Sequence, residues 1–139
     1  MTTKSLLLLI AVFGIGFVAG EIRGSAAAMS RVYELRTYTT NDGKLPDLMA
    51  RFRNHTLKIF EKHGMKNIWY GVPQDAPLKD NTLIYLISHD SREAAKKSWD
   101  AFRADAQWKK VAAESEVNGK IVKKVDTVFL DPTDYSPMK

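Results

Sequence analysis

A strand that runs directly into an amphipathic helix, over residues 31–65, constrains the fold of this chain more than any other stretch. Residues 32–39 (VYELRTYT) alternate with a period of two and are rich in β-branched and aromatic side chains, which predicts a strand. From Leu45 the apolar residues recur with a helical period instead, on a helix of about 17 residues. Pro46 suits its first turn, and Gly64 suits the position just past its last turn. The helix is therefore predicted to lie with one face on a sheet.

The segments that follow complete a recognisable order. Residues 67–72 (NIWYGV) and 82–88 (TLIYLIS) are predicted strands, and residues 121–130 form a last one. A second helical pattern starts after Ser91, a plausible N-cap, and is interrupted near Asp105, which indicates two helices or one broken helix. The resulting β-α-β-β-α-β order is the ferredoxin-like plan of the α+β class, with a four-stranded antiparallel sheet and its helices on one face.

Such a sheet has one face that no helix covers. If Leu35 points toward the helices, then Glu34, Arg36 and Tyr38 project from the uncovered face. An uncovered sheet face with aromatic and apolar residues among polar ones is a natural dimer surface. We therefore expect a homodimer.

The first 28 residues have the pattern of a secretory signal peptide. Lys4 supplies a positive charge, residues 6–19 are continuously apolar, and the three alanines at 26–28 offer small residues for cleavage. The apolar run is shorter than the roughly 20 residues that a membrane-spanning helix needs. We expect export, to the periplasm or the medium; the alternatives are a cut after Gly20 or an uncleaved leader, which would be the only contact with a membrane.

Composition narrows the functional classes for the single predicted domain, residues 31–132. The net charge is +5, but basic residues are interspersed with acidic and apolar ones, so we expect no nucleic-acid partner. The sequence contains no cysteine, which excludes disulfides, thiolate metal sites and a cysteine nucleophile. It also lacks a glycine-rich phosphate loop and the common hydrolase and zinc motifs, so no cofactor and no metal are expected.

Two stretches carry a family resemblance. YELRTYTTNDGKLPDLMARFRNHTLKIFEKHGM followed by NIWYGVP, together with a serine-capped helix bearing Trp99, Phe102 and Trp108, resembles the NIPSNAP family. The similarity runs from about Val32 to Asp131. It implies a dimeric α/β barrel, in which two ferredoxin-like sheets pack face to face around a cavity. Related barrels include cofactor-free monooxygenases, haem-degrading enzymes and chlorite dismutases, whereas the activity of NIPSNAP members is mostly undefined.

One position departs from the family pattern. His89 stands where relatives tend to have an aromatic residue, in a Phe-Asp-Ser-like sequence. The departure affects either a site or only the packing.

Five side chains are the candidate ligand-binding residues: Glu34, Arg36, Tyr38, His55 and Tyr85. Glu34 and Arg36 are neighbours on one strand face and either form a structural ion pair or, with Tyr38, bind a small anionic ligand. His55 lies at the edge of the apolar arc of its helix, as a hydrogen-bonded histidine or as an acid, base or axial ligand.

The remaining histidine and the tryptophans have simpler interpretations. His63 is eight residues from His55, so the two cannot chelate one metal, and a role at the helix end is favoured. Trp69, Trp99 and Trp108 are predicted to be core residues.

Three functions remain open at this point. The first is an exported homodimer that binds a small apolar and anionic molecule in the barrel between its sheets. The second is a cofactor-independent oxygenase or isomerase, with His55 as the base and Arg36 and Tyr38 stabilising an oxyanion. The third is haem binding through His55.

Overall fold

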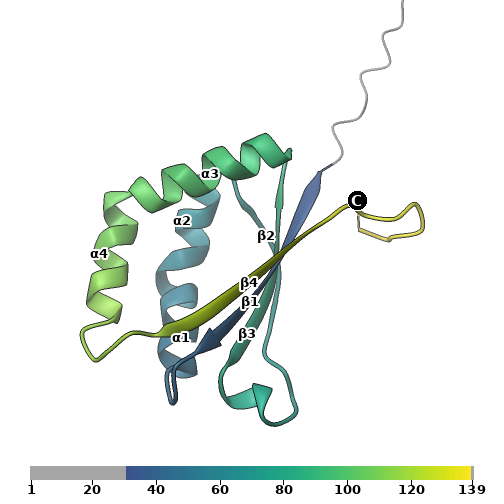
Figure 1. Cartoon of the computed structure of the whole chain (residues 1–139). Helices are drawn as coiled ribbons and strands as arrows, with labels where there is room; N and C mark the ends of the chain where they lie inside the picture. Colours follow the sequence, from purple (N-terminus) through teal and green to yellow (C-terminus); the bar gives the residue numbers. More distant parts are fainter. Residues whose placement is uncertain (1–30, 139) are drawn as a thin grey trace, which may run out of the picture.

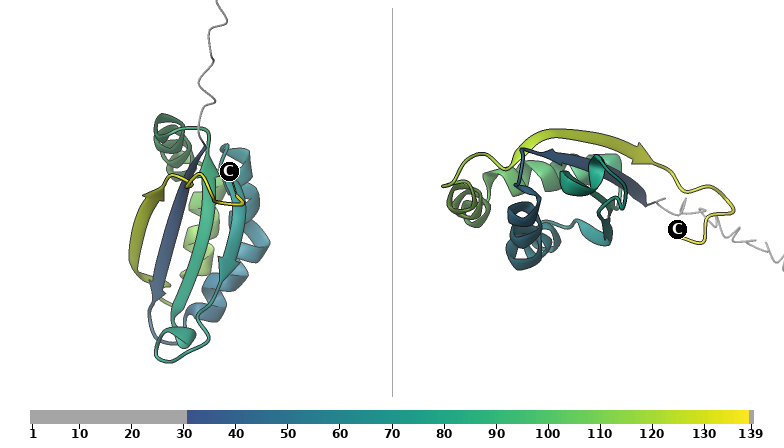
Figure 2. Two further views of the ribbon diagram at one scale, coloured as in Figure 1. Left: turned by 90° about the vertical axis from the view of Figure 1, so that its right-hand side faces the viewer. Right: turned by 90° about the horizontal axis from the view of Figure 1, so that it is seen from below.

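The computed structural model describes residues 31–138, which form one four-stranded antiparallel sheet with all helices on a single face (Figure 1). The strands lie in the order β2-β3-β1-β4, and their bounds are β1 Val32–Thr40, β2 Lys66–Gly71, β3 Thr82–His89 and β4 Val122–Leu130. The helical segments are α1 Leu45–Arg51, η1 Phe52–Thr56, α2 Leu57–Lys62, η2 Leu78–Asp80, α3 Arg92–Ala104 and α4 Ala106–Ser115. Two further views show the sheet and the helix layer separately (Figure 2). The predicted ferredoxin-like fold is confirmed.

The turn glycines and helix caps predicted from the sequence lie at the ends of the observed helices. Gly43 and Gly64 both have positive φ, 72° and 79°, at the turn before α1 and at the end of α2. The Ser91 hydroxyl accepts a hydrogen bond from the Ala94 amide at 3.0 Å and caps α3. The break near Asp105 is confirmed, since Asp105 ends α3 and caps α4. The predicted leader and its cleavage sites lie outside the described residues.

The long helix is continuous from Leu45 to Lys62, but its middle segment η1 is a π-helix. The Thr56 hydroxyl donates to the Arg51 carbonyl, five residues back, at 3.2 Å. A π segment widens the turn and shifts the residues that follow it around the helix axis. Arg51, the last residue before this segment, and Phe52, its first residue, are both buried, although the periodic pattern predicts only Phe52 to be inside.

The prediction of which side chains of β1 face the helices is wrong. Glu34 accepts a hydrogen bond from Trp99 of α3, and the Tyr38 ring contacts Phe52 of η1. The row of Glu34, Arg36 and Tyr38 therefore points into the helix layer, and Leu35 points to the uncovered face. The polar row is inside because side chains distant in the sequence satisfy it, which outweighs the ordinary preference for burying leucine.

We call the uncovered face the open face. It carries an apolar row that crosses all four strands. Leu35 of β1 pairs with Leu86 of β3 and Val128 of β4. Trp69 of β2 lies beside Leu86, and Trp69 and Val128 are exposed by 54% and 52%.

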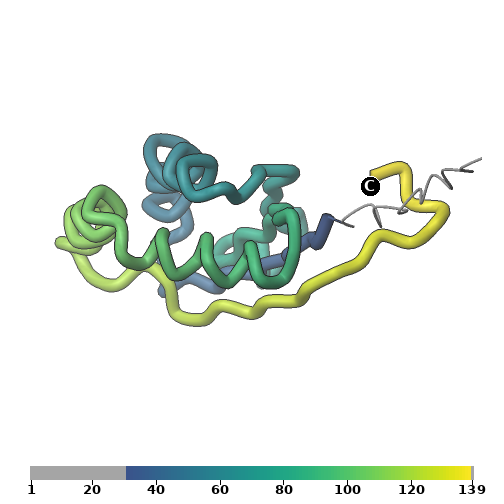
Figure 3. The backbone as a smooth tube through the Cα atoms, turned by 90° about the horizontal axis from the view of Figure 1, so that it is seen from above, coloured from purple at the N-terminus to yellow at the C-terminus, as the bar shows by residue number. Residues whose placement is uncertain are grey.

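The chain beyond β4 turns back on itself past the end of that strand (Figure 3). Its residues Pro132 and Met138 line a shallow groove together with Tyr33, Leu86 and Leu130. The tail therefore covers one end of the open face and leaves the rest uncovered. No helix within residues 31–138 is long and apolar enough to cross a bilayer.

Candidate functional site

A buried carboxylate organises the polar row on the helix side of the sheet. Glu34 is 1% exposed and accepts three hydrogen bonds from side chains. Arg36 Nη1 donates to Oε1 at 2.7 Å, while His89 Nε2 and Trp99 Nε1 both donate to Oε2 at 2.8 Å. These donors come from β1, β3 and α3, so the carboxylate joins the sheet to the helix layer. We call Glu34, Arg36, His89 and Trp99 the Glu34 cluster.

A chain of phenols continues from the Glu34 cluster along the same face. The Arg36 guanidinium lies 4.2 Å from the Trp99 ring centroid, and its Nη2 donates to the Tyr38 hydroxyl at 3.4 Å. The Tyr85 hydroxyl donates to the Tyr38 hydroxyl at 3.1 Å. Tyr85 in turn stacks on Tyr70 of β2, with ring centroids 5.2 Å apart and an interplanar angle of 12°. Guanidinium and phenols thus form one connected polar and aromatic row.

The surroundings of Glu34 and Tyr85 shift the pKa values of both side chains. Burial alone would raise the pKa of Glu34, but the hydrogen bonds from His89, Trp99 and Arg36 outweigh it and lower that pKa. Burial raises the pKa of the Tyr85 phenol well above its ordinary value. Glu34 is therefore a carboxylate, and Tyr85 is a neutral phenol that can donate its proton to Tyr38.

Solvent reaches this row from the β4 side. The Arg36 side chain is 16% exposed, and its neighbour on β4 is the exposed Thr127. Val125, which pairs with Tyr38 and lies on the same face, is also exposed. The helix layer therefore stops short of β4, and Arg36 is accessible although Glu34 is not.

An apolar groove of about 240 Å³ lies at the other end of the phenol chain, between the long helix and β2 and β3. We call it the Tyr70 groove, and its lining residues are Met49, Phe52, Arg53, Leu57, Tyr70 and Leu83. The Phe52 ring contacts Tyr38, Tyr70 and Tyr85, with centroids 5.2 to 5.9 Å apart. The groove is thus backed by the row that carries four of the five predicted site residues.

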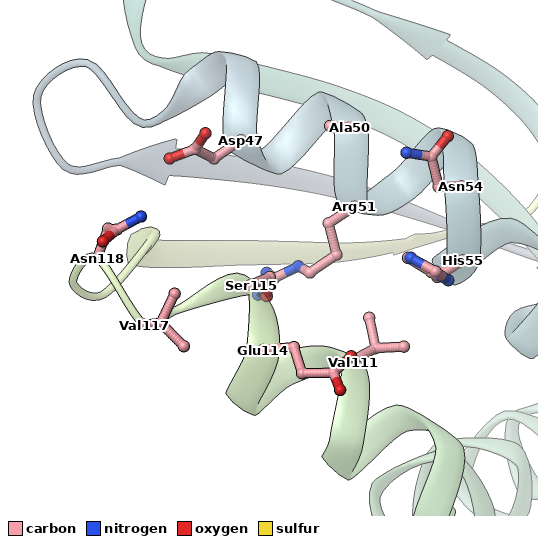
Figure 4. A pocket seen from close by; sticks show the side chains of 10 residues that line it. All are labelled: Asp47, Ala50, Arg51, Asn54, His55, Val111, Glu114, Ser115, Val117 and Asn118. Carbon is pink, nitrogen blue, oxygen red and sulfur yellow. Dashed lines mark hydrogen bonds between the residues drawn. The ribbon is translucent and has the colours of Figure 1, made fainter.

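His55 is the predicted site residue that lies elsewhere. It is exposed and lines a groove between α1–η1 and α4, beside Arg51 and Asn54 (Figure 4). Arg36 and Tyr38 do not line that groove. The structure therefore brings Glu34, Arg36, Tyr38 and Tyr85 together and leaves His55 apart from them.

Two residues that the sequence pattern assigned to other roles also belong to the site. Trp99 is a core residue as predicted, but its indole N–H also binds Glu34. His89, noted as a departure from the family pattern, is fully buried in the cluster, and no partner for its Nδ1 is found within residues 31–138. The apolar pattern does not include Arg51, because arginine is ordinarily an exposed residue, yet Arg51 is buried.

His63 lies at the end of α2, where its Nε2 is 2.6 Å from Asp105 Oδ2. Lys62 donates to the same oxygen at 2.7 Å. Within residues 31–138 no group of three or more histidine, aspartate and glutamate side chains is arranged to hold a metal ion.

Comparison with known proteins places the chain in a family. Residues 33–137 match the NIPSNAP family model, so this protein belongs to the NIPSNAP family. A NIPSNAP family protein of unknown function from Agrobacterium tumefaciens has a similar structure, with a TM-score of 0.69 and 17% identity over 80% of this chain and 96% of that one. No curated protein matches the chain.

More distant structures include two oxygenases from Streptomyces. SnoaB, a cofactor-independent oxygenase from Streptomyces nogalater, has a TM-score of 0.53 and 11% identity over 78% of this chain and 98% of that one. A monooxygenase from the ActVA-Orf6 gene of Streptomyces coelicolor, in complex with the ligand nanaomycin D, has a TM-score of 0.53 and 11% identity over 76% and 89%. At this identity the similarity shows a shared fold.

Proposed function

We propose that this protein is exported, forms a homodimer through its open face and binds a small aromatic molecule in the Tyr70 groove. The observation that carries the binding proposal is the position of that groove, whose Phe52 and Tyr70 walls contact the half-buried Tyr38 and the buried Tyr85. An apolar surface with a few convergent polar groups is typical of small-molecule sites. This groove is on the helix side of one sheet, whereas the family resemblance implies a ligand between two sheets.

The groove favours a flat ligand with one polar edge. Its lining is almost entirely apolar, and edge-to-face contacts with Phe52 and Tyr70 suit an aromatic ring. The Tyr38 ring contacts Phe52, and its hydroxyl accepts a hydrogen bond from Arg36, so we place the polar edge of the ligand on the side of the groove nearest Tyr38. A phenol or a quinone has this combination of surfaces.

Equilibrium dialysis with 1-naphthol tests this proposal. Leu57→Arg places a charged side chain in the groove and is expected to weaken binding at least tenfold. Leu78→Arg is the matched control, because Leu78 is equally apolar, half exposed and outside the groove. Absence of saturable binding to the unmodified protein, or equal binding by both variants, would exclude the site. Native mass spectrometry of protein purified from its own host would then identify the natural ligand.

The dimer proposal depends on the apolar surface of the open face. Leu35, Leu86, Val128 and Trp69 form a continuous patch there, and monomeric proteins rarely expose large patches of this kind. A second copy would cover it with an identical surface, as a two-fold interface requires.

Sedimentation velocity tests the dimer with two variants of one strand. Val128→Lys places a charge on the open face and is expected to give monomers at micromolar concentration. Val125→Lys is the control, because Val125 is a similarly exposed valine on the opposite face of β4. A monomeric unmodified protein, or dimers formed equally by both variants, would contradict the proposal.

Cofactor-independent oxygenation is the alternative function, favoured by the Streptomyces structures and by the buried phenol and guanidinium row. His55 does not lie beside Arg36, so the base in such a reaction would be a group other than the one predicted from the sequence. Oxygen uptake with 1,5-dihydroxynaphthalene, measured without added metal or flavin, separates catalysis from binding alone. A Soret band on haem titration that His55→Ala abolishes would support the third function instead.

A further inference from the structure

The groove that contains His55 is a second candidate site, separate from the Tyr70 groove (Figure 4). Its volume is about 310 Å³, within the range of small-molecule pockets. One wall is the face of α1 and η1 that carries Arg51, and the other is the end of α4 with the loop after it. We call it the Arg51 groove, and its lining residues are Asp47, Ala50, Arg51, Asn54, His55, Val111, Glu114, Ser115, Val117 and Asn118.

Arg51 lies in this groove with fewer partners than its five N–H donors require. The residue is 6% exposed, and its Nε has no hydrogen-bond partner within residues 31–138. Its Nη1 donates to Ser115 Oγ at 3.3 Å and to Glu116 Oε1 at 3.4 Å, both longer than the roughly 2.7–2.9 Å of a strong charge-assisted bond. The guanidinium also lies 5.2 Å from the centroid of the Trp108 ring. These contacts compensate its burial only in part, so an anion that adds shorter hydrogen bonds to its terminal nitrogens would bind favourably.

Further polar side chains in the groove are also free to bind a ligand. Asn54 and His55 of η1 and Asn118 of the loop form no side-chain hydrogen bonds with other residues of the described part of the chain. Asn54 and His55 lie three and four residues after Arg51, which places them on the same side of the helix. Both belong to the π segment, and π segments are frequent at functional sites. Val111 and Val117 supply an apolar wall opposite them.

The charge of the rim limits which anion fits. Asp47 and Glu114 line the groove, and both are exposed and paired only with lysines of their own helical regions. Their negative potential disfavours a doubly charged ligand more than a singly charged one. We infer that the Arg51 groove binds a small monocarboxylate, with the carboxylate on Arg51 and the body of the ligand against Val111 and Val117.

A titration with benzoate tests this inference, using protein expressed from the full sequence. The readout is the ¹H–¹⁵N spectrum, including the arginine Nε–H resonances. We expect saturable shifts at Arg51, Asn54, His55 and Ser115, weaker binding of phenyl phosphate and no saturable binding of the neutral isostere benzamide. Absence of saturation by about 10 mM benzoate, above the millimolar range of weak specific binding, would overturn the inference. Equal binding of benzamide would overturn it as well.

Two pairs of variants identify the groove. Arg51→Lys keeps the charge but loses the planar fork and is expected to weaken benzoate binding about tenfold, whereas Arg103→Lys, at an exposed arginine outside both grooves, leaves it unchanged. Val117→Glu adds a negative charge at an exposed rim position and is expected to weaken binding about fivefold. Val125→Glu is its control, and equal affinity of these two variants would overturn the inference even if Arg51→Lys fails to fold.

The two proposed sites fail separately. Leu57→Arg is expected to weaken 1-naphthol binding in the Tyr70 groove at least tenfold and to leave benzoate binding unchanged. Loss of both ligands in this variant would show that they share one site, which contradicts the Arg51 groove as a separate one.

Discussion

Strand β1 presents different kinds of side chain to the two faces of the sheet. On the helix side β1 presents Glu34, Arg36 and Tyr38, and neighbouring strands and α3 satisfy them with hydrogen bonds and ring contacts. On the open face the same strand presents Leu35, beside an apolar patch that nothing within residues 31–138 covers completely. Polar residues are buried where partners are present, and apolar residues are left exposed where a second molecule is expected. We therefore propose ligand binding on the helix side and dimer assembly on the open face.

Removal of one carboxylate from each face gives the largest expected contrast. Glu34→Ala leaves the Arg36 charge in the helix layer without its counter-ion and is expected to lower the free energy of unfolding by about 3–5 kcal/mol. Asp126→Ala removes an exposed carboxylate of β4 that pairs with Lys124 on the open face, and should cost less than about 1 kcal/mol. Urea unfolding followed by circular dichroism measures both. Similar losses would mean that the Glu34 cluster contributes no more than a surface pair.

The two tryptophans of the opposite faces give a smaller contrast. Trp99→Phe removes the indole N–H from Glu34 and the larger ring from Arg36, at an expected cost of about 1–3 kcal/mol. Trp69→Phe changes an exposed ring and should stay within about 0.5 kcal/mol for the monomer. The same unfolding experiment, below the concentration at which dimers form, compares them. A larger loss at Trp69 would reverse the assignment of the faces.

Acid sensitivity gives the smallest contrast. The folded-state pKa of Glu34 is below its ordinary value of 4.5, so its contribution to stability is complete above about pH 4.5 and is lost as the pH falls through the lowered value. Asp105 acts with the same sign, because hydrogen bonds from Lys62 and His63 lower its pKa. Glu34→Gln and Asp105→Asn should each flatten the decline of stability below pH 4.5, and Asp126→Asn should not. Unfolding curves measured between pH 3 and pH 7 test this prediction. An unchanged slope in Glu34→Gln and Asp105→Asn would contradict it.

Sequence patterns predict the order of elements well because the relevant signals are local. The change from a period of two to a helical period at Leu45, the glycine at position 64, the Ser91 cap and the break at Asp105 each act within a few residues. The antiparallel sheet and the ferredoxin-like order follow from these elements.

The orientation of β1 was not predictable in the same way. Alternation separates Glu34 from Leu35 but does not say which row faces the helices. The orientation of the strand depends on Trp99 and His89, which lie 65 and 55 residues after Glu34 in the sequence. The burial of Arg51 is unpredictable for a related reason, since its partners Ser115 and Glu116 lie 64 and 65 residues away in the sequence.

Asp105 has a mechanical consequence for the Arg51 groove. Its Oδ1 accepts the Gln107 and Trp108 amides at the start of α4, while its Oδ2 accepts Lys62 at the end of α2. One carboxylate therefore fastens the two helices together at one end, and Arg51 with Ser115 holds them at the other. These contacts hold α4 against the long helix at both ends, which disfavours ligands that would need a wider groove. We therefore expect the Arg51 groove to bind small ligands in preference to large ones that carry the same carboxylate.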